Sequence, residues 1–239
     1  MKKTRNAGKA LMWALAAWAV VAWGIAGGAG AEGYPSAKAA CQVANITLID
    51  GSTQTDWTTL LCNRIKTANQ KDLFVDVSFE CGLYTQTLVR SKGGVKDTST
   101  AEAIVKVRVL VDGEPAFPGD VVFSRRMQEL SATLQGIIND DALILVDTDG
   151  DGIPDAVQID EDLLTPEEIE LILDTMTANS FNFVLNDLSS GVHTIEVQAK
   201  IDTATSAQEG TASATATIGK GSVTVEEVRL IKDDDIVLD

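Results

Sequence analysis

Alternating apolar and polar residues dominate the chain after residue 31. Four segments place apolar side chains at every second position and polar ones between them: Leu73–Cys81, Val105–Val111, Ile195–Ile201 and Ala212–Ile218. A period of two is the repeat of a β-strand, whose successive side chains point to opposite faces of a sheet. One polar face per strand indicates antiparallel sheets with a solvated side. The pattern therefore predicts a mostly β fold, an antiparallel β-sandwich of jelly-roll-like arrangement.

Short connections between the strands predict two hairpins. Gly219-Lys220-Gly221 is expected to form the turn between the last two strands. If Trp57–Thr67 and Leu73–Tyr84 also form a hairpin, residues 68–70 are its turn. In the last strand Glu226-Glu227 adds a residue to the alternation, which predicts a β-bulge.

The region from about 140 to 180 is predicted to be an insertion in the sandwich. Ser124–Asn139, just before it, fits a helix or a strand, and the β-like sequence that precedes it favours a strand. Thr165-Pro166-Glu167-Glu168 carries a capping threonine, a proline at the first helical position and a capping-box glutamate. Apolar residues then follow at helical spacing, so residues 166–178 are predicted to form one amphipathic helix, before β structure resumes at Phe181–Leu185.

Residues 147–155 have the spacing of a calcium-binding loop. Aspartates occupy positions 1, 3, 5 and 9 of the sequence D-T-D-G-D-G-I-P-D, and glycine occupies position 6. Alternate side chains of a curled loop point inward, and carboxylate oxygens are the ligands that Ca²⁺ prefers, whereas Mg²⁺ requires strict octahedral geometry and retains waters. The predicted ligands of a Ca²⁺ ion are Asp147, Asp149, Asp151, the carbonyl of Ile153, Asp155, and Asp160 or Glu161 beyond the loop.

The loop resembles the calcium loops of thrombospondin type 3 repeats and, more distantly, those of EF-hands. The resemblance covers only residues 147–155. A predicted strand, Ala142–Val146, precedes the loop where an EF-hand has a helix, and Gln158 stands at position 12 in place of a bidentate glutamate. We therefore expect an affinity of about micromolar to millimolar, as in other extracellular sites. The hypothesis is that the ion orders residues 147–165 and docks the predicted helix on the sandwich.

The N-terminal sequence predicts export. Four basic residues precede an apolar run from Ala10 to Ala26, and Ala29-Gly30-Ala31 has the form of a signal-peptidase site. Residues 1–31 are thus predicted to be a signal peptide, and residues 32–239 a single domain secreted to an extracellular or periplasmic space. The alternative is an uncleaved anchor, since the run approaches the ~20 residues that span a bilayer. The weak insertion tendency of Ala and Gly favours cleavage, which leaves no membrane segment.

The predicted mature domain is strongly acidic and contains all three cysteines. Removing residues 1–31 changes the formal net charge from −16 to −20, which excludes nucleic acid and anionic membranes as partners because both require a basic surface. In an oxidising compartment Cys41, Cys62 and Cys81 are disulfide candidates, with one thiol left over. The predicted hairpin offsets Cys62 from Cys81 and favours a bridge that uses Cys41, but the pairing stays open.

No pattern in the sequence specifies an enzymatic reaction. His193 is the only histidine, at the start of a strand, and acidic pairs such as Glu226-Glu227 are expected by chance among 35 acidic residues. The predicted function is a calcium-binding, non-catalytic structural or interaction module of a surface or extracellular assembly, with a homo-oligomer or a surface partner. The alternatives are a carbohydrate-binding module and a carboxylate-dependent hydrolase. The predicted mature chain has one tryptophan, Trp57, which weakens the glycan alternative because sugars stack on exposed aromatic rings.

Overall fold

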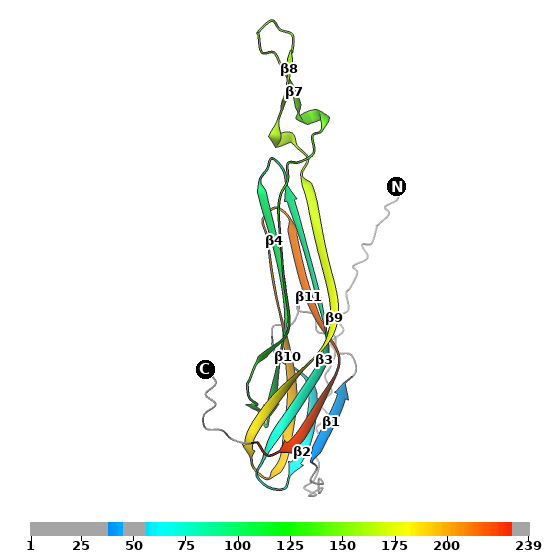
Figure 1. Ribbon diagram of the computed structural model, residues 1–239, viewed down its shortest axis with the longest axis vertical. Coiled ribbons are helices and arrows are strands. Elements are labelled where there is room, and N and C mark those ends of the chain that lie inside the picture. The colour runs from blue at the N-terminus through cyan, green and yellow to red at the C-terminus, as the bar shows by residue number, and fades with distance from the viewer. Residues whose placement is uncertain (1–37, 45–55, 231–239) are drawn as a thin grey trace, which may run out of the picture. The chain divides into compact units, whose positions relative to one another are not determined.

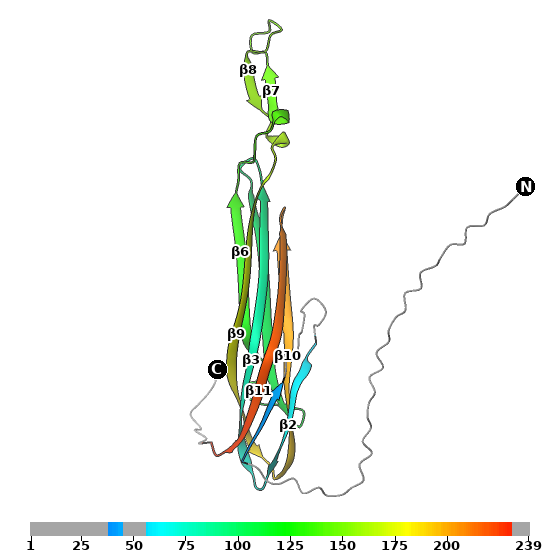
Figure 2. The same ribbon diagram turned by 90° about the vertical axis from the view of Figure 1, so that its right-hand side faces the viewer.

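The computed structural model describes residues 38–44 and 56–230, so the predicted signal peptide lies outside the described residues. Two stacked antiparallel sheets account for most of this part of the chain (Figures 1 and 2). This arrangement confirms the prediction of a mostly β, antiparallel sandwich. Within the described residues no helix is long and apolar enough to cross a membrane.

The first sheet has the strand order β1-β11-β3-β9. Its members are β1 (Ala39–Ala44), β3 (Lys71–Ser91), β9 (Glu167–Leu188) and β11 (Thr211–Val228). The second sheet has the order β2-β10-β4, with β5 and β6 both paired to β4. Its members are β2 (Thr58–Thr67), β4 (Lys96–Val111), β5 (Glu114–Pro115), β6 (Val121–Thr133) and β10 (Gly191–Ala207).

The apolar core lies between the two sheets and consists of the alternating positions seen in the sequence. Strand β4 buries every second side chain along its whole length, and β3 and β10 do the same over most of theirs. Phe79 of β3 and Phe123 of β6 meet edge to face across the sandwich, with ring centroids 6.0 Å apart. Each fully buried Val, Leu, Ile or Phe contributes about 1.5–3 kcal/mol, so this layer supplies the main drive for folding. Its largest members are Phe183, Leu61, Ile65, Leu73, Ile195, Ile201 and Ile218.

The interior becomes polar toward the C-terminal half of β3. Gln128 of β6 is buried there and accepts a hydrogen bond from the Thr85 hydroxyl (2.7 Å). Its amide nitrogen donates to the Thr87 hydroxyl (2.6 Å) and to the Leu171 carbonyl of β9 (2.8 Å). The side chain therefore joins both sheets through hydrogen bonds, which satisfies groups whose burial alone would be costly.

The predicted helix over residues 166–178 is wrong, because residues 167–178 belong to β9. Strand β9 pairs with β3 without a register shift from Leu185 to Glu167. Its apolar residues fit both a helical and an alternating spacing, and the long strand β3 supplies a ladder of hydrogen bonds that decides between them. Pro166 stands just before the strand, where the missing N–H breaks no ladder bond.

Four further expectations concerned turns, a bulge and strand length. Strand β11 runs through Gly219-Lys220-Gly221, so these residues form no hairpin turn. The predicted bulge at Glu226-Glu227 is also absent, because both residues pair with β3 in an unbroken register; the register shift of β11 lies between Ile218 and Gly221 instead. Strands β2 and β3 belong to different sheets, which overturns the other predicted hairpin. The expected strand within Ser124–Asn139 is confirmed, because β6 continues to Thr133.

Candidate metal-binding loop

A small hairpin positions the acidic loop. Between β6 and β9 the chain forms a 3₁₀ turn η1 (Asp140–Ala142), strands β7 (Leu143–Val146) and β8 (Ala156–Ile159), and a second 3₁₀ turn η2 (Glu161–Leu163). The ladder of β7 and β8 joins the two ends of the loop at residues 147–155, since Val146 pairs with Ala156. The strand predicted before the loop is thus present as β7.

Hydrogen bonds close the base of this insertion. Ile137 and Thr165 exchange two backbone hydrogen bonds of 2.8 and 3.0 Å. The Asn139 side chain accepts from the Ala142 N–H and donates to the Leu163 carbonyl and the Thr165 hydroxyl. The two ends of the insertion are therefore fixed to each other before the chain enters β9.

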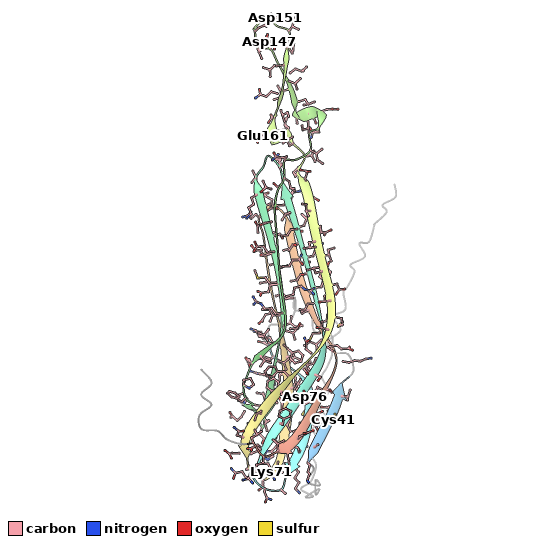
Figure 3. All side chains as sticks on the ribbon, viewed as in Figure 1. Cys41, Lys71, Asp76, Asp147, Asp151 and Glu161 are labelled. Atoms are coloured by element: carbon pink, nitrogen blue, oxygen red, sulfur yellow. The ribbon has the colours of Figure 1, made fainter. Side chains whose placement is uncertain are left out.

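Three aspartates of the loop form a cluster that could hold a metal ion. Asp147, Asp149 and Asp151 each offer a carboxylate oxygen, and these oxygens all lie within 4.8 Å of one another. Figure 3 labels Asp147 and Asp151 in the loop that joins β7 and β8. Because Ca²⁺–oxygen distances are about 2.3–2.6 Å, oxygens on opposite sides of one ion lie up to about 5 Å apart. The donor set and its spacing therefore fit such an ion.

Backbone N–H groups orient the first aspartate of the cluster. The two oxygens of Asp147 accept hydrogen bonds from the N–H groups of Gly150 and Gly152, each at 2.7 Å. Both glycines have positive φ angles, 80° and 87°, which a residue with a Cβ rarely adopts. The N–H of Gly152, then that of Gly150, lowers the pKa of Asp147 below its ordinary value, so the carboxylate is kept ionised.

The other two members of the cluster accept local hydrogen bonds. One oxygen of Asp149 accepts from the Asp151 N–H (3.1 Å), and one oxygen of Asp151 accepts from the Ile153 N–H (2.8 Å). Each bond spans two residues, as in an Asx turn, and curls the loop around the carboxylates. The other oxygen of each group does not take part in these turns.

The cluster does not include the remaining predicted ligands that follow it, Ile153, Asp155 and Asp160. Asp155 accepts from the N–H of Thr148 (2.9 Å) and from its hydroxyl (2.8 and 2.7 Å), which ties the two ends of the loop and lowers the Asp155 pKa. The Ile153 side chain is exposed, and Asp160 caps η2 by accepting from the Asp162 N–H. The contribution of Thr148 was not predicted, because a threonine at position 2 is no part of the calcium-loop spacing.

The three cysteines are free thiols in this structure. Cys41 and Cys62 are exposed, and Cys81 is buried in the core. Burial raises the pKa of the Cys81 thiol to about 12. Strand β1 is linked to β2 next to these residues, because the Gln42 side chain accepts a hydrogen bond from the Cys62 N–H (2.8 Å). The structure thus separates Cys81 from the two exposed cysteines and joins no pair.

His193 occupies a structural position at the start of β10. One ring nitrogen lies 2.7 Å from an Asp112 carboxylate oxygen, and the other lies 2.9 Å from the Ser189 carbonyl. Burial acts to raise the pKa of Asp112, but the N–H of Thr194 and the His193 side chain hold it below its ordinary value. These contacts tie the turn after β4 to β10.

Comparison with known proteins identifies no family. No protein-family model matches the chain, and no curated protein matches it. Among solved structures it is similar to a chain titled "Structure of infectious bursal disease virus Gx strain", with 10% sequence identity and a TM-score of 0.13. The match covers 81% of this chain and 42% of that one, so the chain spans less than half of the viral chain. A likeness at this level carries no argument about function.

Proposed function

We propose that this protein is an exported, calcium-binding, non-catalytic structural or interaction module. The observation that carries the proposal is the cluster of Asp147, Asp149 and Asp151, whose carboxylate oxygens lie within 4.8 Å of one another on a loop closed by a β-ladder. Three exposed carboxylates at this distance repel one another, and a divalent cation between them removes that repulsion. The formal charge of −20 on residues 32–239 adds a field that attracts cations.

The chemistry of the cluster favours Ca²⁺ over Mg²⁺. Three carboxylates on a short, exposed loop leave room for backbone carbonyls and waters, which suits the six to eight oxygen ligands of calcium. The low affinity expected for such a site suits an exported protein, because extracellular calcium sites work in the range of about 10⁻⁴–10⁻³ M.

The expected role of the ion is to order the loop between β7 and β8. The ion docks no helix, since residues 167–178 form part of β9. The base of the insertion is already held by the Ile137–Thr165 pair and by Asn139. A bound ion would thus stabilise the far end of the hairpin, where short local hydrogen bonds such as the Thr148–Asp155 contacts hold the loop.

Calcium titration of the protein spanning residues 32–239 tests this proposal. After chelator treatment, isothermal titration should show saturable Ca²⁺ binding that is lost in D147N/D149N/D151N. The matched control D140N/D141N/D162N removes the same charge from exposed aspartates outside the loop and should bind as the wild type does. Equal Ca²⁺ binding by both variants would indicate diffuse counterion attraction and would reject the site. In a separate titration, Mg²⁺ at the same concentration should compete only weakly with Ca²⁺.

The strand order supports a jelly-roll-like arrangement within this proposal. With the two-residue strand β5 left aside, each layer has four strands, β1-β11-β3-β9 and β2-β10-β4-β6, and the first four strands of the chain enter the two layers alternately. Eight strands distributed over two sheets in this way characterise jelly rolls, which occur in capsid and lectin domains among others. Because one fold supports many functions, the fold adds no substrate or partner.

The carbohydrate-binding alternative stays a prediction. The Arg108 guanidinium lies 4.3 Å from the ring centroid of Trp57, so a cation covers one face of that ring. A sugar would have to stack on the opposite face. A glycan array on the protein spanning residues 32–239, with Trp57→Ala as the control, would test this alternative.

A further inference from the structure

Strand β9 forms the end of its sheet and is paired on one side only. It is the last strand in the order β1-β11-β3-β9, and all of its ladder contacts go to β3 (Figures 1 and 2). On its other side the described residues provide a single bridge. Phe117 donates to the Val184 carbonyl (2.8 Å) and accepts from the Val184 N–H (2.9 Å).

That bridge fixes which backbone groups of β9 point away from β3. In an antiparallel pair, residues alternate between those whose N–H and C=O face the partner strand and those whose groups face away. Val184 faces away, and the register with β3 has no shift from Leu185 to Glu167. The even-numbered residues from Glu170 to Asn182 therefore present their N–H and C=O groups to the free edge. Among the described residues no backbone pairs with them.

Contacts from the neighbouring sheet agree with this alternation. Arg126 and Gln128 of β6 donate to the carbonyls of Leu173 and Leu171, respectively. Both acceptors are odd-numbered, so these side chains reach the inner face of the sandwich and leave the edge open.

The free edge combines exposed apolar side chains with neutral polar ones and carries little charge. Ile172 is 49% exposed and Met176 is 64% exposed, both on the outer face of the sheet. Residues 171–183 contain one ionisable side chain, Asp174, in a chain that is 23% charged. Natural edge strands are protected from pairing by short length, lysine, proline or a bulge. Strand β9 is 22 residues long, contains no lysine or proline, and has its only register irregularity at its C-terminal end.

The other edge strands differ from β9 in these respects. Strand β1 has 6 residues, β2 has 10 residues with Arg64 and Lys66, and β6 has 13 residues with Arg125 and Arg126. Each is thus shorter, and two carry basic side chains that resist strand addition. Of these four outermost strands, β9 offers the longest free edge and is the one suited to accept another strand.

We infer that this edge binds the β9 strand of a second copy of the chain, antiparallel about a two-fold axis. Such an isologous pairing joins the two sheets into one continuous sheet. It deepens the interaction role proposed above and uses none of the calcium argument. The pairing extends over residues 170–182 of each copy, because Phe117 occupies the edge at Val184.

The distribution of charge along β9 favours this partner and orientation. Within the paired range 170–182 the two acidic residues, Glu170 and Asp174, lie N-terminal to Met176, and residues 175–183 are neutral. With Met176 on the two-fold axis, Glu170 of one copy faces Asn182 of the other and Asp174 faces Ala178, so that no two acids are opposed. Parallel pairing in register would instead place Glu170 of one copy beside Glu170 of the other. Like charges at opposed positions are destabilising.

Sedimentation velocity of the protein spanning residues 32–239 tests the inference. We expect a concentration-dependent dimer that strengthens as salt rises from 50 to 500 mM (roughly a threefold shorter Debye length), because screening reduces repulsion between acidic copies. Ala178→Pro should weaken the dimer about 10-fold or more, since it removes an edge N–H that β3 does not use. Ala178→Ser keeps that N–H and should dimerise as the wild type does.

Several results would contradict the predicted dimer. A monomer at every concentration and salt level would overturn it, and so would a dimer that A178P leaves unchanged. If A178P fails to fold by circular dichroism, Ile172→Lys replaces it, and an unchanged dimer in that variant has the same meaning. D147N/D149N/D151N should still dimerise, so failure of the calcium proposal and failure of this one are distinguishable.

Discussion

Replacing Asp97 by asparagine is a sharp test of how the polar end of the sandwich is held together. The side chain is 1% exposed, and its carboxylate accepts three backbone hydrogen bonds. One oxygen accepts from the Arg90 N–H of β3 (2.6 Å), and the other accepts from the N–H groups of Thr98 (2.8 Å) and Glu209 (3.1 Å). A single carboxylate thereby joins β3, β4 and the turn between β10 and β11.

An asparagine at this position keeps one acceptor oxygen and places an NH₂ group against a backbone N–H. At least one buried N–H then loses its partner, and the surviving bonds lose their charge assistance. With about 1–3 kcal/mol for an unsatisfied buried group and a similar value for a charge-assisted bond, Asp97→Asn should reduce the free energy of unfolding by about 2–4 kcal/mol. Urea unfolding at pH 7, followed by circular dichroism, measures this difference. Asp141→Asn, at an exposed carboxylate, is the control.

The difference in unfolding free energy between the wild type and Asp97→Asn should also depend on pH. Burial acts to raise the pKa of Asp97, but the N–H groups of Arg90, Glu209 and Thr98 outweigh it and lower the pKa below its ordinary value of 3.8. A lowered pKa contributes stability that is present above the unfolded-state pKa and is lost as the pH falls through the folded-state pKa. The stability difference between wild type and Asp97→Asn should therefore shrink below about pH 4. A difference under ~0.5 kcal/mol at pH 7, the range of an ordinary surface substitution, would refute the reasoning.

Three further predictions concern the interior. Gly221→Ala should lower the free energy of unfolding by about 1–3 kcal/mol, because a Cβ there would overlap the Phe79 ring; urea midpoints equal to the wild type would contradict this. Cys81 should resist maleimide at pH 8 in the folded, reduced protein, since burial raises its pKa to about 12. The exposed Cys41 and Cys62 should react, and equal labelling rates for all three cysteines by mass spectrometry would contradict this prediction. Gln128→Leu should cost about 2–3 kcal/mol in urea unfolding, because it leaves two threonine hydroxyls and a β9 carbonyl without their buried partner, and an unchanged midpoint would show that the network is dispensable.

The sandwich could be predicted from the sequence because burial on one face imposes a period of two. Strands with a single wet face, such as Val105–Val111, have no other way to bury their apolar side chains. Strand β9 was missed because its side chains are mostly exposed, so burial imposes no single period on it. Its capping-box sequence then favoured a helix locally, and pairing with β3 outweighed that preference.

Two glycines caused the second error, the predicted turn at Gly219-Lys220-Gly221. Gly219 and Gly221 indicate a turn when only their neighbours in sequence are considered. In the structure they lie within β11, where the Phe79 ring of β3 approaches Gly221 too closely for a Cβ and the Glu80 side chain approaches Gly219 tightly. A close approach from another strand leaves no local signal, so the turn and the displaced bulge could not have been told apart from sequence alone.

The acidic loop was the most predictable part of the candidate site. Spacing alone located Asp147, Asp149 and Asp151, because hairpin loops of this length curl alternate side chains toward one another. The position of Asp155 depended on a hydrogen bond to the Thr148 hydroxyl, which no ligand-spacing rule includes. The buried group formed by Gln128 and the β3 threonines also escaped prediction, since polar residues in an alternating strand are expected to face solvent.

Calcium binding by the loop is the central claim, and Tb³⁺ luminescence tests it most directly. A lanthanide replaces Ca²⁺ at oxygen sites, so the chelator-treated protein spanning residues 32–239 should bind Tb³⁺ at one saturable site. Ca²⁺ should displace it at about micromolar to millimolar concentration. D147N/D149N/D151N should show no saturable signal, and D140N/D141N/D162N should match the wild type. A signal that survives loss of the three clustered aspartates, or one that Ca²⁺ does not displace, would contradict the account.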